Sequence, residues 1–264
     1  MLEAFGYLGA ALMGLSLGLI GGGGSILTVP ILVFLFGIPV ETATAYSLFT
    51  VGLTSLFGSL SHIRLGNIHW RTALVFGLPA IVGVFATRRF VMPAIPHILF
   101  TVGEFTFTKD IFLLFVFAIL MVLAAGSMIR QRQPRPTDQV VKFQYALILV
   151  EGLVVGCVTG LVGAGGGFLI IPALVILANL PMKQAVGTSL VIIAAKSMIG
   201  FLGDVHAELV VDWPFLLIFS AIAILGIVAG SLLSTRVEEE KLKPAFGWFV
   251  LAMGMYILGR ELLG

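Results

Sequence analysis

Long apolar runs with few charges among them constrain this chain more than any other feature of its sequence. Charged residues make up 11% of the chain and hydrophobic residues 59%, whereas soluble domains carry about 25% charged residues. These proportions exclude a soluble enzyme, a nucleic-acid-binding protein and a disordered chain. They predict an all-α polytopic membrane protein, because the strands of a membrane barrel alternate apolar and polar residues. The apolar runs fall near residues 4–21, 25–37, 41–62, 70–92, 109–130, 143–163, 167–179, 182–206, 213–234 and 241–262.

Two of these runs are too short to cross a bilayer. Residues 25–37 and 167–179 have only 13 residues each, whereas a spanning helix needs about 20. We interpret them as half-helices or re-entrant arms. Such arms are tolerated where protein or a water-filled cavity covers the broken backbone. The sequence alone leaves open whether they cross the membrane or return.

A polar linker at residues 131–142 divides the chain into residues 1–130 and residues 143–264. Its proline and charge content marks a loop. Placing this linker in the cytoplasm puts both termini outside, with ten Lys and Arg residues inside and four outside. Arg88 and Arg89 are among the four outside. This distribution follows the positive-inside rule and predicts a multi-pass protein of a prokaryotic inner membrane.

The two halves contain an internal repeat. When residues 14–58 are aligned without gaps to residues 156–200, 17 of 45 positions are identical, and they include glycines and prolines that shared hydrophobicity does not explain. Each half carries an odd number of apolar runs, so the second half enters the membrane from the opposite side. We therefore expect two inverted repeats, each with a glycine-broken helix or re-entrant arm and about three further transmembrane helices, as in many secondary transporters.

Glycine clusters interrupt both halves at equivalent positions. The clusters read Gly21-Gly22-Gly23-Gly24-Ser25 and Gly163-Ala164-Gly165-Gly166-Gly167. Consecutive glycines permit positive φ and end one helix, and the next helix then begins with free N–H groups and the positive end of its dipole. Two such starts brought together predict an anion site without any basic side chain. Spaced glycines such as Gly14 and Gly18 are interpreted as close helix packing instead.

Polar residues near the breaks complete the predicted substrate site. Ser47 and Ser189 align under the repeat, and their hydroxyls either donate to an anion or bond back to the preceding turn. Lys196 lies near the middle of an apolar run, where a charge is a functional candidate by default. The predicted substrate-binding residues are Gly22, Gly23, Gly24, Ser25, Ser47, Gly165, Gly166, Gly167, Thr188, Ser189 and Lys196.

Further ionisable residues are candidates for coupling or gating. Glu151 lies well inside an apolar run and either carries a proton or pairs with Lys196. The remaining candidates lie at the ends of apolar runs, where interfacial solvation is the alternative interpretation. They are His62, Arg64, Asp204 and His206.

The doubled motif resembles that of the TauE/SafE family of sulfite exporters, a TSUP-type group of membrane transporters. In this sequence the motif runs from Gly14 to Leu32 and from Gly156 to Leu174, with an A-x-x-x-S-L helix start after each. The resemblance implies export of a small sulfur-containing anion, such as sulfite, thiosulfate or an organosulfonate, by alternating access in which one half rocks against the other. Ser25 and Gly167 differ at one aligned position, which bears on the choice of anion.

Other functions find less support in the sequence. An intramembrane enzyme would need a nucleophile and base or a metal cluster, but the chain has no HExxH or Walker motif and a single cysteine. We therefore expect neither a cofactor nor a metal. A passive anion channel remains the main alternative to a transporter. The sequence also leaves open whether the chain forms a homodimer.

Overall fold

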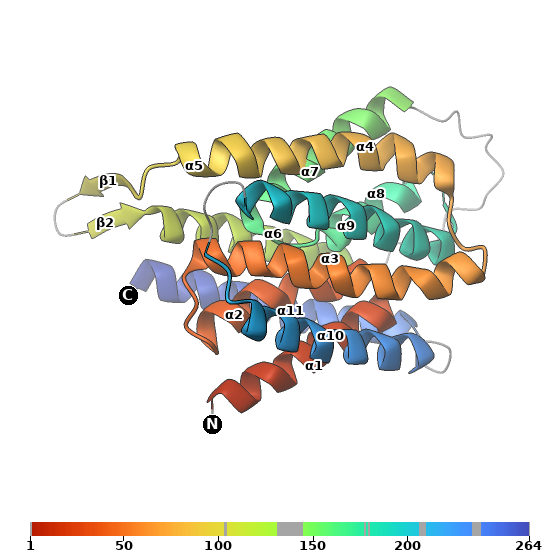
Figure 1. The fold of residues 1–264 in the computed structure, drawn as a ribbon, viewed down its shortest axis with the longest axis horizontal. Helices are drawn as coiled ribbons and strands as arrows, with labels where there is room; N and C mark the ends of the chain where they lie inside the picture. The colour runs from red at the N-terminus through yellow and green to blue at the C-terminus, as the bar shows by residue number, and fades with distance from the viewer. Residues whose placement is uncertain are drawn as a thin grey trace.

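The computed structural model describes residues 2–102, 105–130, 145–176, 178, 180–205, 210–233 and 239–263, and nearly all of these residues are helical (Figure 1). Six helical segments in this part of the chain are long and apolar enough to cross a membrane, and three shorter apolar segments accompany them. The prediction of an all-α polytopic membrane protein is therefore confirmed. The 131–142 linker lies outside the described residues.

The helices follow the predicted apolar runs closely. In chain order they are α1 (Leu2–Ile20), η1 (Gly22–Leu27), α2 (Thr28–Phe34), α3 (Val40–Arg64), α4 (Trp70–Ala86), η2 (Thr87–Val91), α5 (Met92–Ala94), α6 (Lys109–Ile129), α7 (Tyr145–Val162), α8 (Gly167–Ile176), α9 (Met182–Val205), α10 (Trp213–Leu233) and α11 (Glu239–Leu263). Here η1 is a 3₁₀ helix and η2 a π-helical turn.

One element was not expected. Strands β1 (Ile98–Val102) and β2 (Phe105–Thr108) form an antiparallel hairpin between α5 and α6. The rings of Phe100 and Phe107 stack across it, with 4.8 Å between their centroids. The threonines and aromatic residues of this segment favour strands. The hairpin extends beyond the helical body, beside the end that carries both termini (Figure 1).

The first short arm returns along the helix that precedes it. Gly9 of α1 faces the side chain of Ile31 in α2, and the ring of Tyr7 meets that of Phe36 at 5.2 Å. The arm formed by η1 and α2 therefore runs back toward the N-terminus. In Figure 1, α8 likewise runs back to the end of the molecule at which α7 begins. Both arms are re-entrant, which answers the question that their length left open.

Two helix pairs are held together by glycines packed on backbone carbonyls. In the pair α1–α10, a Cβ on Gly14 would overlap the carbonyl of Ala223, and one on Gly226 would overlap that of Ala11. The pair α4–α7 repeats this arrangement with the carbonyls of Phe76, Ala80 and Leu153. Such approach is possible only without side chains, so the packing interpretation of the spaced glycines is confirmed. Helices α3 and α9 pack together at the centre, and α6 packs on α11.

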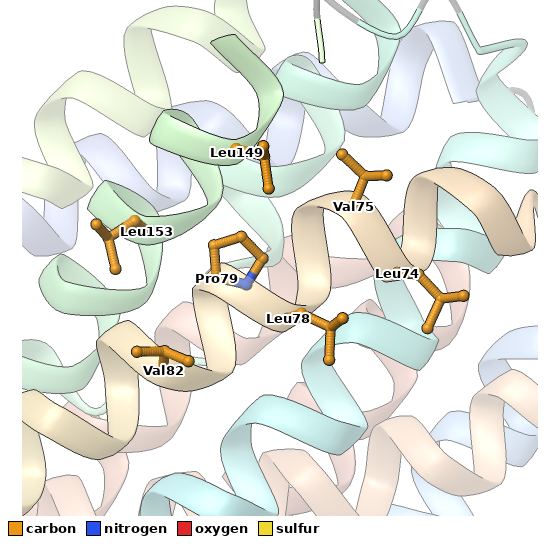
Figure 2. Close-up of a pocket in the computed structure, with 7 residues that line it drawn as sticks. All are labelled: Leu74, Val75, Leu78, Pro79, Val82, Leu149 and Leu153. Atoms are coloured by element: carbon orange, nitrogen blue, oxygen red, sulfur yellow. The ribbon is translucent and has the colours of Figure 1, made fainter. Parts of the chain in front are cut away.

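An apolar groove of about 470 Å³ lies open on the surface between α4 and α7 (Figure 2). Its lining contains no polar side chain and consists of Leu74, Val75, Leu78, Pro79, Val82, Leu149 and Leu153. Five of these leucine and valine side chains are exposed at the surface, as is expected of a face that contacts lipid. The groove offers an anion no hydrogen-bond donor, so a substrate site is expected in the protein interior.

The fold makes a prediction about sidedness. In Figure 1 both termini and the hairpin lie at one end of the molecule, whereas α7 and α9 begin at the other end. In a Cys157→Ala chain, we expect single cysteines at Glu3 and His97 to react with a membrane-impermeant maleimide in intact cells. Cysteines at Arg64 and Lys183 should react only after permeabilisation. All four native side chains are exposed.

Agreement within the pair Glu3 and His97, and within the pair Arg64 and Lys183, tests the topology. Which pair reacts in intact cells tests the orientation. Opposite labelling of Glu3→Cys and His97→Cys would contradict the fold. Reversal of both pairs together would retain the fold and overturn only the assignment of the outside.

Candidate functional site

The two glycine breaks meet in the interior of the molecule. A Cβ built on Gly22 would fall on the Cα of Gly167, and the reverse is also true, so these two backbones touch. Gly165 faces Val51 of α3 and Ile193 of α9, residues near the middle of their helices. The structure thus brings together the two segments that the sequence predicted to form one site. Every residue from Gly21 to Pro30 and from Gly163 to Phe168 is buried.

Positive φ angles at glycine create both breaks. Gly21 has φ of 78° before η1, and its repeat equivalent Gly163 has φ of 72° at the end of α7. Gly166 also has φ of 72°, immediately before α8. Residues that carry a side chain rarely have positive φ, so glycine is required at these positions. The N–H groups of Leu169 and Ile170 donate to the carbonyl of Gly166, whereas those of Gly167 and Phe168 precede the first turn and lie at the positive end of the α8 dipole.

Lys196 lies against the start of α8. Its side chain is 0% exposed, and its Nζ donates a hydrogen bond of 2.6 Å to Thr159 Oγ1 on α7. A Cβ on Gly166 would lie 3.1 Å from this Nζ. A buried ammonium and a helix N-terminus are both sources of positive potential, and each is stabilised by a nearby negative charge.

No carboxylate pairs with Lys196 in the described part of the chain. The ion pairs found there join Arg88 to Asp204 and Lys109 to Glu41. Glu151 does not pair with Lys196, and its buried Oε2 has no hydrogen-bond partner among the described residues. Of the two interpretations of Glu151, the ion pair is therefore wrong, and proton transfer stays a prediction.

The predicted hydroxyls divide into two groups. Ser25 and Ser189 bond back to the carbonyls of Gly22 and Val186, each over 2.8 Å. Thr188 Oγ1 accepts the backbone N–H of His69 over 3.0 Å. These three hydroxyls already have structural partners. In contrast, Ser47 Oγ is buried without a hydrogen-bond partner in the described residues.

Sequence reasoning missed two further hydroxyls of the same kind. Ser55 and Ser197 have buried Oγ atoms without a partner in the described part of the chain. Ser55 lies one helical turn beyond Val51, the residue that faces Gly165, and Ser197 follows Lys196 directly. The signal that could have found them was present, because Ser55 and Ser197 are identical under the repeat.

The coupling and gating candidates separate to the two ends of the molecule. His62 and Arg64 end α3, and His62 lies beside Gly187 of α9. Asp204 lies at the other end, where it pairs with Arg88 at 3.3 Å. His206 lies outside the described residues. Arg88, which the charge count assigns to the outer side, lies at this same end, and its side chain is 0% exposed, because the helix continues through η2 and turns this residue inward.

Comparison with known proteins identifies relatives over nearly the whole chain. The family model described as sulfite exporter TauE/SafE matches residues 7–257. A probable membrane transporter protein of Xylella fastidiosa is 31% identical over 256 residues, which cover 95% of this chain and 92% of the relative. The probable membrane transporter protein YdhB of Bacillus subtilis is 29% identical over 250 residues, covering 94% and 96%. No solved structure matches this chain.

The contact between the breaks predicts a sharp difference between neighbouring glycines. Gly22→Ala would force the touching backbones apart, and such overpacking costs about 1–3 kcal/mol. Gly23→Ala is the matched control, because its Cβ would meet side chains alone, the nearest being the flexible end of Met128 at 3.3 Å. We expect Gly22→Ala to lower the melting temperature in detergent and Gly23→Ala to leave it nearly unchanged. Equal melting temperatures for the two variants would refute the contact.

Proposed function

The chain belongs to the sulfite exporter TauE/SafE family, and from this premise we propose that it is a secondary transporter that exports a small sulfur-containing anion. The membrane transporter class rests on the family and its relatives. The anion we propose is sulfite, thiosulfate or an organosulfonate, bound where the two glycine breaks meet. The single observation that carries this proposal is the position of Lys196. This fully buried lysine of α9 lies beside the N-terminus of α8, and its described partner is a neutral hydroxyl.

A bound oxyanion would complete the surroundings of Lys196. Its oxygens would accept hydrogen bonds from the ammonium and from the first N–H groups of α8. Ser47, Ser55 and Ser197 have hydroxyl groups without another partner in the described residues. Ser47 and Ser55 are eight residues apart on α3, about 12 Å along its axis, so one anion can use only one of these two at a time. A tetrahedral or pyramidal sulfur anion has several oxygens pointing in different directions, so it can use donors on more than one helix at once.

The inverted repeat remains part of the proposal, and the packing supports it. Helices α1 and α10 are joined by glycine–carbonyl contacts, and α7 and α4 are joined in the same way. Gly21 faces Val186, and its equivalent Gly163 faces Thr44, which is the position aligned to Val186. Each contact therefore has an equivalent in which the two halves swap roles, as a pseudo-twofold axis requires.

The burial of the site favours a transporter over a passive channel. Lys196 and both glycine clusters are closed to solvent, whereas a conducting channel needs a continuous route that ions can enter and leave. Closure on both sides is expected of an occluded state in alternating access. Export of an anion from a cell with a negative interior gains about 2.3 kcal/mol per charge per 100 mV. The membrane potential therefore suffices as a driving force, and Glu151 is the candidate for an added proton coupling.

Transport by the purified protein tests the function. We expect proteoliposomes to take up radiolabelled sulfite, thiosulfate or methanesulfonate with saturation, and imposed voltage and pH gradients will identify the driving force. Preloading the vesicles with unlabelled anion should accelerate uptake, because a carrier exchanges substrate whereas a channel does not. Failure of all three anions to enter would overturn the substrate class, and uptake without acceleration would favour the channel.

Substitution of Lys196 tests the site. Lys196→Met replaces a buried charge with an apolar side chain of similar length, a change that buried sites often tolerate. We expect its half-saturating anion concentration to rise about tenfold or more, the effect of losing a charge-assisted hydrogen bond. Lys183→Met, at the exposed start of the same helix, is the matched control. Unchanged half-saturation in Lys196→Met would return this lysine to a structural role.

A further inference from the structure

A second cation, Arg88, is buried between the central helices and the end that carries the termini. Its side chain is 0% exposed. Nη1 donates to Thr44 Oγ1 at 3.0 Å and to Asp204 Oδ1 at 3.4 Å. Nε and Nη2 are also buried, but neither has a hydrogen-bond partner in the described residues. These two atoms form one edge of the guanidinium, with parallel N–H groups that match two oxygens of a single oxyanion.

Arg88 lies beside the glycine break rather than apart from it. Thr44, which accepts from Arg88, is also the residue that Gly163 packs against. Asp204 is eight residues beyond Lys196 on α9, about 12 Å along the helix axis. The Arg88–Asp204 pair therefore lies about 12 Å from Lys196 along the axis of α9, toward the end with the termini.

The cluster of Arg88, Thr44 and Asp204 has no counterpart at the positions that are equivalent under the repeat. Under the repeat, Asp204 aligns with His62 and Thr44 with Val186. Contacts also relate Arg88 to Ser231, because Gly160 packs on Thr87 while Gly18 packs on Gly230 and Ser231. The equivalent positions at the opposite end therefore lack both the guanidinium and the carboxylate. Because burying two charges costs desolvation energy, a gain in stability alone is a weak explanation for a buried ion pair found at one end only.

We propose that Arg88 forms a second anion site, which receives the transported oxyanion after Lys196 on its way to the face with the termini. This proposal rests on the proposed function. The anion binds in a bidentate manner to Nε and Nη2, while Nη1 keeps its bond to Thr44. Asp204 neutralises the guanidinium in the absence of an anion and repels the anion once it has bound. The site is therefore weaker than the Lys196 site, which suits release.

Calorimetric titration of sulfite into detergent-solubilised protein tests this site. In a Lys196→Met background we expect residual sulfite binding, which should weaken about tenfold in Lys196→Met/Arg88→Gln, since a hydrogen bond to a charged group is lost. Arg89→Gln in the same background is the matched control, because it removes a neighbouring charge whose side chain is exposed. Equal sulfite affinity in the Arg88 and Arg89 variants would overturn the second site.

Asp204→Asn separates a binding role from a structural one. This variant leaves Arg88 without its counterion, so the melting temperature should fall in chloride or gluconate. Sulfite should restore more of the melting temperature of Asp204→Asn than it adds to wild type, because the anion replaces the lost carboxylate. Equal shifts in the two proteins would indicate a structural pair only. If wild-type protein binds no sulfite, thiosulfate or methanesulfonate, the proposed function itself fails, and this site fails with it.

Discussion

The backbone contact between Gly22 and Gly167 is the constraint on which the rest of the structure depends. A helix broken inside a membrane leaves N–H and carbonyl groups without partners, and lipid cannot satisfy them. Here each break is covered by the other, at a separation that only two glycines permit. The arm after α1 returns along that helix, and residues of α3 and α9 lie against the meeting breaks. The free helix start therefore faces protein and Lys196 rather than lipid.

The charged residues follow the sequence repeat far less closely than the glycines do. Lys196 aligns with Thr54, whose hydroxyl only bonds back to the carbonyl of Thr50, over 2.6 Å. Arg88 and Asp204 likewise have no charged equivalents at the opposite end, where Asp204 aligns with His62 and contacts relate Arg88 to Ser231. The proposed inverted repeats would move alike in both directions, but the bound anion would meet different groups on the two sides. In the proposed mechanism this asymmetry moves the anion off the pseudo-axis and gives its path a direction.

The sequence predicted the helices and the meeting of the breaks far better than the partners of individual polar side chains. Apolar run length and glycine clusters are local signals, so α1 to α11 and the two short arms lie close to their predicted ranges. Hydrogen-bond partners depend on helix rotation, which the repeat does not specify. Ser189 and Ser47 are equivalent in sequence, but only Ser189 bonds to a carbonyl in the described residues. The burial of Arg88 could not be predicted either, because it depends on the extension of the helix through η2 and on Asp204, a partner that is distant in sequence.

The packing also decides which parts can move, and these are not the two repeats. Glycine–carbonyl contacts tie α1 of the first half to α10 of the second, and α7 of the second to α4 of the first, so each pair should move as one body. The contact between α3 and α9 is less close. A Cβ on Gly52 would lie 3.0 Å from the flexible side chain of Met198 and 3.1 Å from its backbone N, whereas a Cβ on the glycines of the other two pairs would overlap carbonyl oxygens. Rocking of whole halves is therefore disfavoured, and motion across the α3–α9 contact is favoured. Lys196 and Arg88 belong to the body with α4, α7 and α9, but Arg88 donates to Thr44 on α3. That bond must break before the anion can leave at this end.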